Sequence, residues 1–121
     1  PAGGADHRGE RHAFSREFLA RVARGGPDDL ALLPMAGNAM EPTLRDGDLL
    51  LVDQSQREPV CGKVFALAID GRVLVRRLDA RPGSLLVVAD NRDYPLLKIP
   101  PAEMRSLRIV GRAVWLGREN L

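Results

Sequence analysis

The chain has little of what extracellular, membrane and nucleic-acid-binding proteins usually carry. Among its 121 residues there is one cysteine, Cys61, which excludes an internal disulfide framework and is typical of a reducing compartment. No apolar run approaches the about 20 residues that cross a bilayer, and the N-terminal residues contain no hydrophobic signal-peptide core. We therefore predict a cytoplasmic protein with no membrane attachment.

The chain also has almost no excess of charge of one sign, because 18 basic residues are balanced by 16 acidic ones and the formal net charge is +2. The basic residues are scattered, mostly one or two at a time, and no cluster forms a track for phosphates. We do not expect this chain by itself to bind nucleic acid. The two histidines, His7 and His12, form no closed set of metal ligands, so neither a metal nor another cofactor is expected.

What is present is the composition of one globular domain. Hydrophobic residues make up 45% of the chain and charged residues 28%, and a length of 121 residues suits a single core. Residues 1–13 are rich in glycine and polar side chains without periodicity, which predicts a flexible arm or linker remnant. The folded domain is expected over residues 14–121.

One short amphipathic helix is predicted at the start of this domain. Apolar residues between Phe14 and Arg24 recur at helical spacing, and Ser15 precedes most of them as a candidate N-cap. The run of Gly and Pro at residues 25–27 ends the helix. A single further helical turn is expected over residues 100–106.

The rest of the sequence favours short β-strands joined by turns. Asp70 and Gly71 separate two apolar runs, as the two central residues of a hairpin do. The pattern predicts a mainly β domain of short, highly twisted strands, coiled or barrel-like, with one short N-terminal helix. The expected strands are residues 30–36, 48–53, 63–69, 72–78, 84–89 and 107–116.

The turn GNAMEPTL, residues 37–44, has no ordinary strand or helix pattern. Gly37 permits a close backbone approach, and residues 40–42 can form a short helical turn whose free N–H groups point back toward residue 39. Such a turn is suited to holding an oxyanion. The alternative is a plain connection whose side chains Met40 and Leu44 fill the core, and the residues alone leave both open. The candidate cleft residues are Asn38, Met40 and Glu41.

Four segments in order resemble the C-terminal domain of LexA and the lambda-type phage repressors, a family of self-cleaving serine–lysine peptidases. These segments are GNAMEPTLRDGDLLLVD, KVFALAIDGRVLVRRL, VVADNRDYPLLKI and RIVGRAVW. The similarity extends over about residues 30–116, and the order of four separate motifs is more specific than any one of them. It implies the fold of that domain, and with it a regulatory role.

The resemblance assigns two positions to chemistry, and both depart from the family pattern. The family motif Gly-(Asp/Asn)-Ser-Met-x-Pro carries the nucleophilic serine, and a buried neutral lysine is the general base. The serine position is Ala39 here and the lysine position is Arg76. A methyl group cannot attack a carbonyl, and a guanidinium stays protonated, so we predict that self-cleavage is absent.

Other residues that invite a functional interpretation are weaker candidates. The family cleaves an Ala-Gly or Cys-Gly bond a few tens of residues before its nucleophile, which makes Ala2 and Gly3 a candidate cleavage site, although flexible linkers also contain these residues. Cys61 is not favoured as a replacement nucleophile, because both histidines lie in the predicted arm.

The motif at residues 90–95 resembles a family turn, and we interpret it as an Asx-type turn with Tyr94 packed beneath it. Trp115 is interpreted as a core or dimer-edge aromatic residue.

The interpretation we favour is a dimerisation and regulatory C-terminal domain of a LexA-like or phage-repressor-like transcription regulator without self-cleavage activity. The resemblance implies a homodimer formed through residues 108–116, operator DNA bound by an N-terminal helix-turn-helix domain absent from this chain, and a RecA-like coprotease or antirepressor as a further partner.

One alternative is an active peptidase captured in a disabled form. Another is a vestigial cleft that binds a peptide or antirepressor, with Arg76 pairing with a carboxylate. Arginine is an unusual choice for disabling a lysine, which favours a naturally inactive domain over an engineered one.

Overall fold

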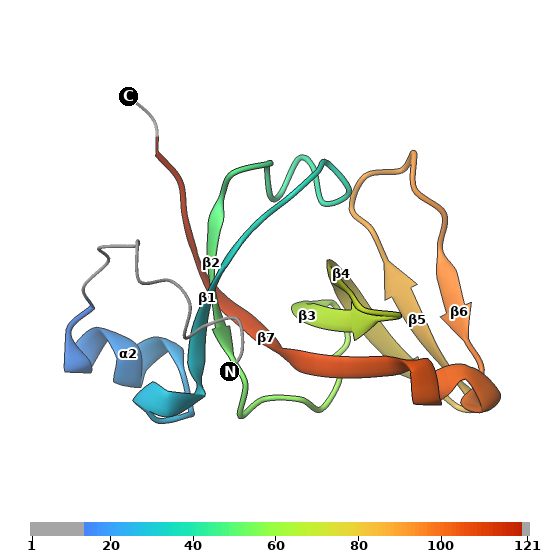
Figure 1. The fold of residues 1–121 in the computed structure, drawn as a ribbon, viewed down its shortest axis with the longest axis horizontal. Coiled ribbons are helices and arrows are strands. Elements are labelled where there is room, and N and C mark those ends of the chain that lie inside the picture. The colour runs from blue at the N-terminus through green and yellow to red at the C-terminus, as the bar shows by residue number, and fades with distance from the viewer. Residues whose placement is uncertain (1–13, 120–121) are drawn as a thin grey trace.

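The computed structural model describes residues 14–119, which form one antiparallel sheet with a single short α-helix beside it (Figure 1). The mainly β fold predicted from the sequence is confirmed. The sheet is curved but does not close into a barrel, since its two outer strands, β1 and β6, do not pair with each other. The strands are β1 Leu30–Pro34, β2 Leu49–Asp53, β3 Lys63–Ile69, β4 Arg72–Arg81, β5 Ser84–Val88, β6 Leu97–Ile99 and β7 Leu107–Gly117.

The last strand, β7, lies in the middle of the sheet. The strand order is β1-β2-β7-β3-β4-β5-β6, and every neighbouring pair is antiparallel. Residues 107–112 of β7 pair with β3, whereas residues 112–117 pair with β2. In Figure 1 this long strand runs from the β3–β4 half of the molecule to the β1–β2 half. It is therefore the one strand that joins the two halves of the sheet.

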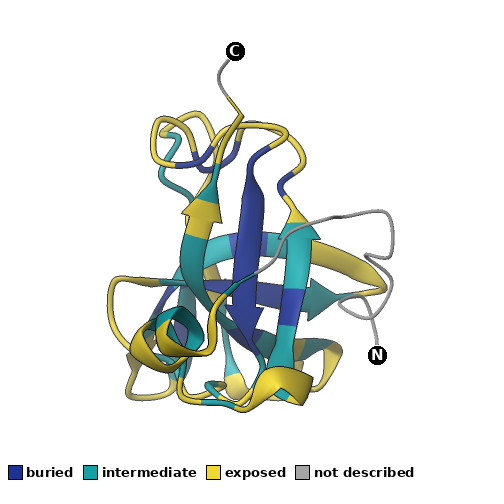
Figure 2. Ribbon diagram, turned by 90° about the vertical axis from the view of Figure 1, so that its left-hand side faces the viewer, coloured by how far each residue is buried: buried dark blue, intermediate teal, exposed yellow. Residues whose placement is uncertain are grey.

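Two apolar clusters stabilise the sheet, and the first of them contains residues of both halves. The first cluster surrounds β2, all five residues of which are buried, as the dark strand in Figure 2 shows. The second lies on β3, β4 and β5, where Phe65, Leu67 and Leu78 are completely buried. Burying each such side chain contributes about 1.5–3 kcal/mol, so these clusters account for much of the favourable free energy of folding.

The helix α2, Arg16–Val22, forms where the sequence predicts it. The backbone N–H of Phe18 donates to Oγ of Ser15 at 3.0 Å, which confirms the predicted N-cap. Phe18 of the helix and Phe14, which precedes it, pack on the end of β7: their rings meet Trp115 edge-on at centroid distances of 6.2 and 5.1 Å. Trp115 therefore holds the helix against the sheet. No helix within residues 14–119 is long and apolar enough to cross a membrane.

The turns also follow the sequence closely. Asp70 and Gly71 have φ angles of 49° and 78°, the left-handed conformation that a two-residue hairpin turn requires. The helical turn predicted over residues 100–106 is a 3-10 helix, η3 Pro101–Ser106. A further 3-10 helix, η2 Pro27–Asp29, and strand β6 were not predicted, because three residues are too few for a periodic pattern.

Candidate functional site

The turn at residues 37–44 connects β1 to β2 and is anchored in the core. The N–H of Leu44 donates to the carbonyl of Met40 at 2.9 Å, which closes a single helical turn, and the Glu41–Pro42 peptide bond is cis. Met40 is completely buried and Leu44 nearly so, in the cluster around β2. The core-filling role that the sequence left open for these two side chains is confirmed.

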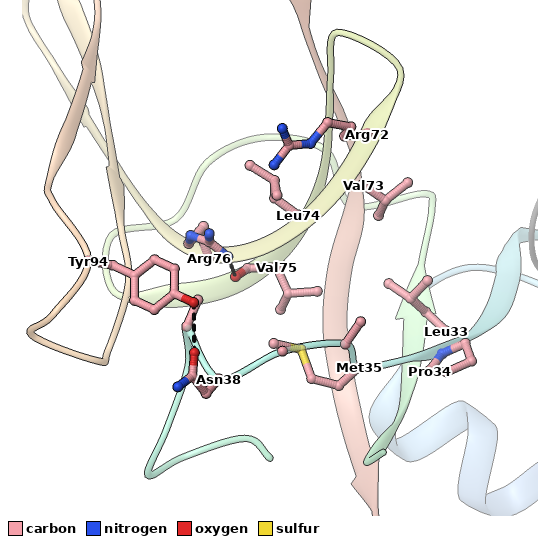
Figure 3. Close-up of a pocket in the computed structure, with 13 residues that line it drawn as sticks. Leu33, Pro34, Met35, Asn38, Arg72, Val73, Leu74, Val75, Arg76 and Tyr94 are labelled. Atoms are coloured by element: carbon pink, nitrogen blue, oxygen red, sulfur yellow. Dashed lines mark hydrogen bonds between the residues drawn. The ribbon is translucent and has the colours of Figure 1, made fainter. Parts of the chain in front are cut away.

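A pocket of about 380 Å³ opens between this turn and the first half of β4 (Figure 3). Ala39, which is 5% exposed, lines it from the turn, and Arg76, which is half-buried, lines it from the strand. The two positions that the resemblance assigns to nucleophile and base therefore border one cavity. Asn38 joins them, whereas the side chains of Met40 and Glu41 do not: the first is buried in the core and the second is exposed.

Tyr94 completes one end of the pocket. Its hydroxyl donates to Oδ1 of Asn38 at 2.7 Å, and its ring centroid lies 5.6 Å from the guanidinium carbon of Arg76 (Figure 3). The predicted Asx turn is present, since the N–H of Asp93 donates to Oδ1 of Asn91 at 2.9 Å, but the expectation that Tyr94 packs beneath it is wrong, because Tyr94 is 38% exposed at the pocket. Tyr94 was not predicted as a site residue. Tyr94 lies within residues 90–95, which resemble a turn of the family, and an aromatic residue in that turn is the signal that could have indicated it.

A second set of contacts fastens the turn to the sheet beside the pocket. The side-chain amide of Asn91 donates to the carbonyl of Asn38 at 3.0 Å, and its backbone N–H donates to the carbonyl of Ala39 at 3.0 Å. Arg77 donates to Asp90 at 2.8 Å, and the same carboxylate accepts a hydrogen bond from the Thr43 hydroxyl. The backbone around Ala39 is therefore held by partners that are remote in the sequence.

Arg76 and its neighbour Arg77 have different electrostatic environments. The hydrogen bond to Asp90 raises the pKa of Arg77, whereas burial lowers the pKa of Arg76. One guanidinium nitrogen of Arg76 donates to the carbonyl of Val75 at 2.8 Å. No carboxylate within residues 14–119 forms an ion pair with Arg76. The shift does not discharge a guanidinium, so the pocket contains a half-buried positive charge.

The remaining candidates lie elsewhere. Cys61 is exposed and does not border the pocket, and a hydrogen bond to Asp79 raises the pKa of its thiol, which makes it less reactive. Ala2, Gly3, His7 and His12 lie outside the described residues. Over the part of the chain that the structure describes, no group of three or more His, Cys, Asp or Glu side chains is placed to hold a metal ion.

The pocket lining combines apolar and positively charged side chains. The thirteen residues that border it include no serine, threonine, cysteine, histidine or lysine, and Tyr94 supplies the one hydroxyl group. It offers instead an apolar wall from β1 and the positive groups of Arg72 and Arg76, with Asn38 and Tyr94 as hydrogen-bonding groups. Arg72 is a second pocket residue that the sequence did not indicate.

Known proteins with similar sequences are bacterial and phage regulators. A family model described as Peptidase S24-like matches residues 1–114. The chain is 29% identical over 112 residues to the repressor protein CI of Enterobacteria phage phi80, covering 91% of this chain and 46% of that protein. It is 36% identical over 91 residues to the LexA repressor of Paracidovorax citrulli, with coverages of 74% and 39%.

A third relative is the HTH-type transcriptional regulator PrtR of Pseudomonas aeruginosa, which is 31% identical over 111 residues, with coverages of 88% and 43%. The chain thus spans less than half the length of these three relatives.

Proposed function

Because the chain belongs to the Peptidase S24-like family, we propose that it is the dimerisation and regulatory domain of a repressor-like transcription regulator and that it does not cleave itself. Its relatives include proteins named as LexA and phage repressors. The observation that carries the proposal is the pocket that Ala39 and Arg76 border together. In this proposal the pocket is the cleft of the family, and it lacks the serine hydroxyl at position 39 and the neutral lysine amine at position 76 that the reaction would need.

The surroundings of Arg76 support the loss of activity. A general base for a serine must be neutral at working pH, and an amine is neutralised by burial away from other polar groups. Arg76 instead lies against the ring of Tyr94 and donates to the carbonyl of Val75. These contacts suit a permanently charged, planar guanidinium.

The strand β7 supports dimerisation. Its residues 113–117 pair with β2 on one side, and the pairing with β3 on the other side ends at Arg112, so within the described range this stretch has an open edge. Unpaired N–H and C=O groups on an edge pair readily with another strand. A two-fold contact between two copies of β7 satisfies both edges at once. This stretch overlaps the contact expected from the sequence over residues 108–116.

DNA binding belongs, in this proposal, to a part of the protein outside this chain. The scattered charge of the chain offers no phosphate track. One relative is named as an HTH-type regulator and is more than twice as long as the segment that matches. A dimer of this domain would hold two such heads together on the two halves of an operator.

The absence of self-cleavage is tested by mass spectrometry at alkaline pH. We expect the natural chain to keep its full mass, because residue 39 has no hydroxyl. We expect the double variant Ala39→Ser, Arg76→Lys to remain intact as well, because the ring of Tyr94, 5.6 Å from the Arg76 guanidinium carbon, would favour the charged form of a lysine at this position. Fragments from the natural chain would contradict the proposal. Cleavage of the double variant alone, at Ala2-Gly3 or elsewhere, would favour the alternative of a disabled active peptidase.

Dimerisation is tested by sedimentation of a variant at the open edge. Leu116 is 37% exposed on β7, and Leu116→Glu would place two like charges close to the two-fold axis. We expect the dimer dissociation constant to rise by about tenfold or more, which corresponds to about 1.4 kcal/mol. Leu96→Glu, at an exposed apolar residue between β5 and β6, is the matched control and should leave it unchanged. A natural chain that sediments as a monomer at high micromolar concentration would refute this part of the proposal.

A further inference from the structure

The first half of β4 has an open backbone edge that faces the pocket. β4 pairs with β3 over residues 72–78, but its pairing with β5 covers only residues 77–81. Residues 72–76 therefore have no strand on the β5 side among those that the structure describes. All five of these residues line the pocket.

The hydrogen bond at Val75 shows which backbone groups face this edge. The carbonyl of Val75 accepts a hydrogen bond from the Arg76 side chain (Figure 3). Because the two-residue Asp70-Gly71 turn makes Ile69 and Arg72 a hydrogen-bonded pair, the backbone groups of Val75 point away from β3. Backbone groups of alternate residues point to the same edge of a strand, so Val73 directs its N–H and C=O the same way. An extended peptide placed alongside would find donors and acceptors at strand spacing, and it would share or replace the hydrogen bond that Arg76 makes to the Val75 carbonyl.

The charged side chains that line the pocket are all positive. Among its thirteen lining residues Arg72 and Arg76 are charged, and no aspartate or glutamate lines it. Arg76 is half-buried without an ion-pair partner in residues 14–119. Burying a charge is unfavourable unless a counter-charge compensates for it, and a guanidinium fits a carboxylate with two parallel hydrogen bonds.

The opposite wall suits the apolar side chains of such a peptide. It consists of residues 33–37, which include Leu33, Pro34 and Met35. In an extended peptide alternate side chains point to the same side. When one carboxylate of the peptide binds Arg76, the side chains two residues before and after it therefore lie along this wall. A volume of about 380 Å³ accommodates side chains of a short segment and not a folded domain.

We propose that the pocket binds an extended, acidic peptide segment of a partner protein, which adds as a strand to the open edge of β4 at Val73 and Val75 and places one carboxylate on Arg76. This inference rests on the proposed function, since it requires a family cleft that holds a peptide without cutting it. Main-chain hydrogen bonds supply affinity, and the guanidinium supplies selection for the acidic residue.

The experiment compares two synthetic peptides by fluorescence anisotropy. Each has about six residues, alternates valine and threonine and carries neutral ends, with a central glutamate in one and a glutamine in the other. We expect the glutamate peptide to bind the natural chain about tenfold more tightly, because one charge-assisted hydrogen-bonded pair distinguishes the two. Methylation of the backbone nitrogens that face β4 should abolish binding of both peptides.

Variants of the chain assign this preference to one side chain. Arg76→Gln should bind the two peptides equally, and Arg76→Lys, a second variant that retains the charge, should keep part of the preference. Arg105→Gln removes the same charge from an exposed position on η3, away from the pocket, and should keep the full preference. Thermal unfolding of each variant confirms that it is folded.

Three results would overturn the inference: equal binding of the two peptides to the natural chain, a preference that survives in Arg76→Gln, or no binding of either peptide. These failures leave the dimer and the intact chain unaffected, so they are distinguishable from failure of the proposed function. Cleavage of a bound peptide, detected as product masses, would instead contradict the loss of catalysis.

Discussion

Replacing Asp53 with alanine should lower the free energy of unfolding by about 4 kcal/mol, since several buried donors lose their acceptor at a cost of about 1–3 kcal/mol each. Asp53 is completely buried at the end of β2. Its carboxylate accepts hydrogen bonds from the N–H groups of Arg24 at 2.8 Å and Gly25 at 3.1 Å, which connects the segment after α2 to the sheet. It also accepts bonds from Ser55 and from the side-chain amide of Gln56.

Urea denaturation monitored by circular dichroism measures this effect. Asp93→Ala is the matched control, because its exposed side chain accepts no hydrogen bond among residues 14–119, and the unfolding free energy should change by less than about 0.5 kcal/mol. Gly25→Ala provides a second probe of the same contact, since a Cβ atom at this position would lie 2.6 Å from Oδ1 of Asp53. Equal unfolding free energies for Asp53→Ala and Asp93→Ala would contradict the role we assign to Asp53.

The same carboxylate makes stability depend on pH in acid. Burial alone would raise the pKa of Asp53, but hydrogen bonds from Gln56, Ser55 and Arg24 outweigh it and hold the pKa far below the usual range. The unfolded carboxyl takes up a proton near its ordinary pKa of about 3.9, whereas the folded one does not. Its contribution is therefore fully present above about pH 4 and decreases as the pH falls further toward the folded pKa. An Asp53→Asn variant should lose this part of the acid dependence.

Met40→Ala should cost about 3 kcal/mol and loosen the pocket, because it removes a completely buried side chain from the turn that carries Ala39. Met40 packs in the cluster around β2 with Met35 and Leu44. A cavity there removes the apolar anchor of the turn, so binding of the glutamate peptide should weaken as well. Urea denaturation and the anisotropy titration measure the two effects.

The chain contains its own control for this experiment. Met104 has the same side chain but is 38% exposed on η3, so Met104→Ala should change the unfolding free energy by less than about 0.5 kcal/mol. If Met40→Ala and Met104→Ala had the same small effect, the turn would not depend on its anchor in the core. The same substitution is expected to cost more at Met40 because it leaves a cavity in the core, whereas at the exposed Met104 it leaves none.

Local features of the fold were predictable because their causes are local. The strand at residues 63–69, the Asp70-Gly71 turn and the cap at Ser15 each depend on neighbours within a few positions. β4 continues to Arg81, three residues beyond its expected end, because β5 pairs with it there. Pairing of this kind depends on residues remote in the sequence, which a local pattern does not contain.

The site was predictable only in part for the same reason. The resemblance indicated positions 39 and 76, and the structure brings both to one pocket. It did not indicate that Tyr94 reaches Asn38, because 56 positions separate these residues and their contact follows from the fold. The open edge of β4 was equally hidden, since it exists only where β5 stops pairing.

The position of β7 between β2 and β3 has a mechanical consequence. One wall of the pocket belongs to the half-sheet of β1 and β2, and the other belongs to the half-sheet of β3 and β4. A small rotation of one half against the other about β7 would change the width of the pocket. In the proposed dimer, strand pairing along β7 would stiffen that axis, and dimer assembly would then be coupled to peptide binding through one strand.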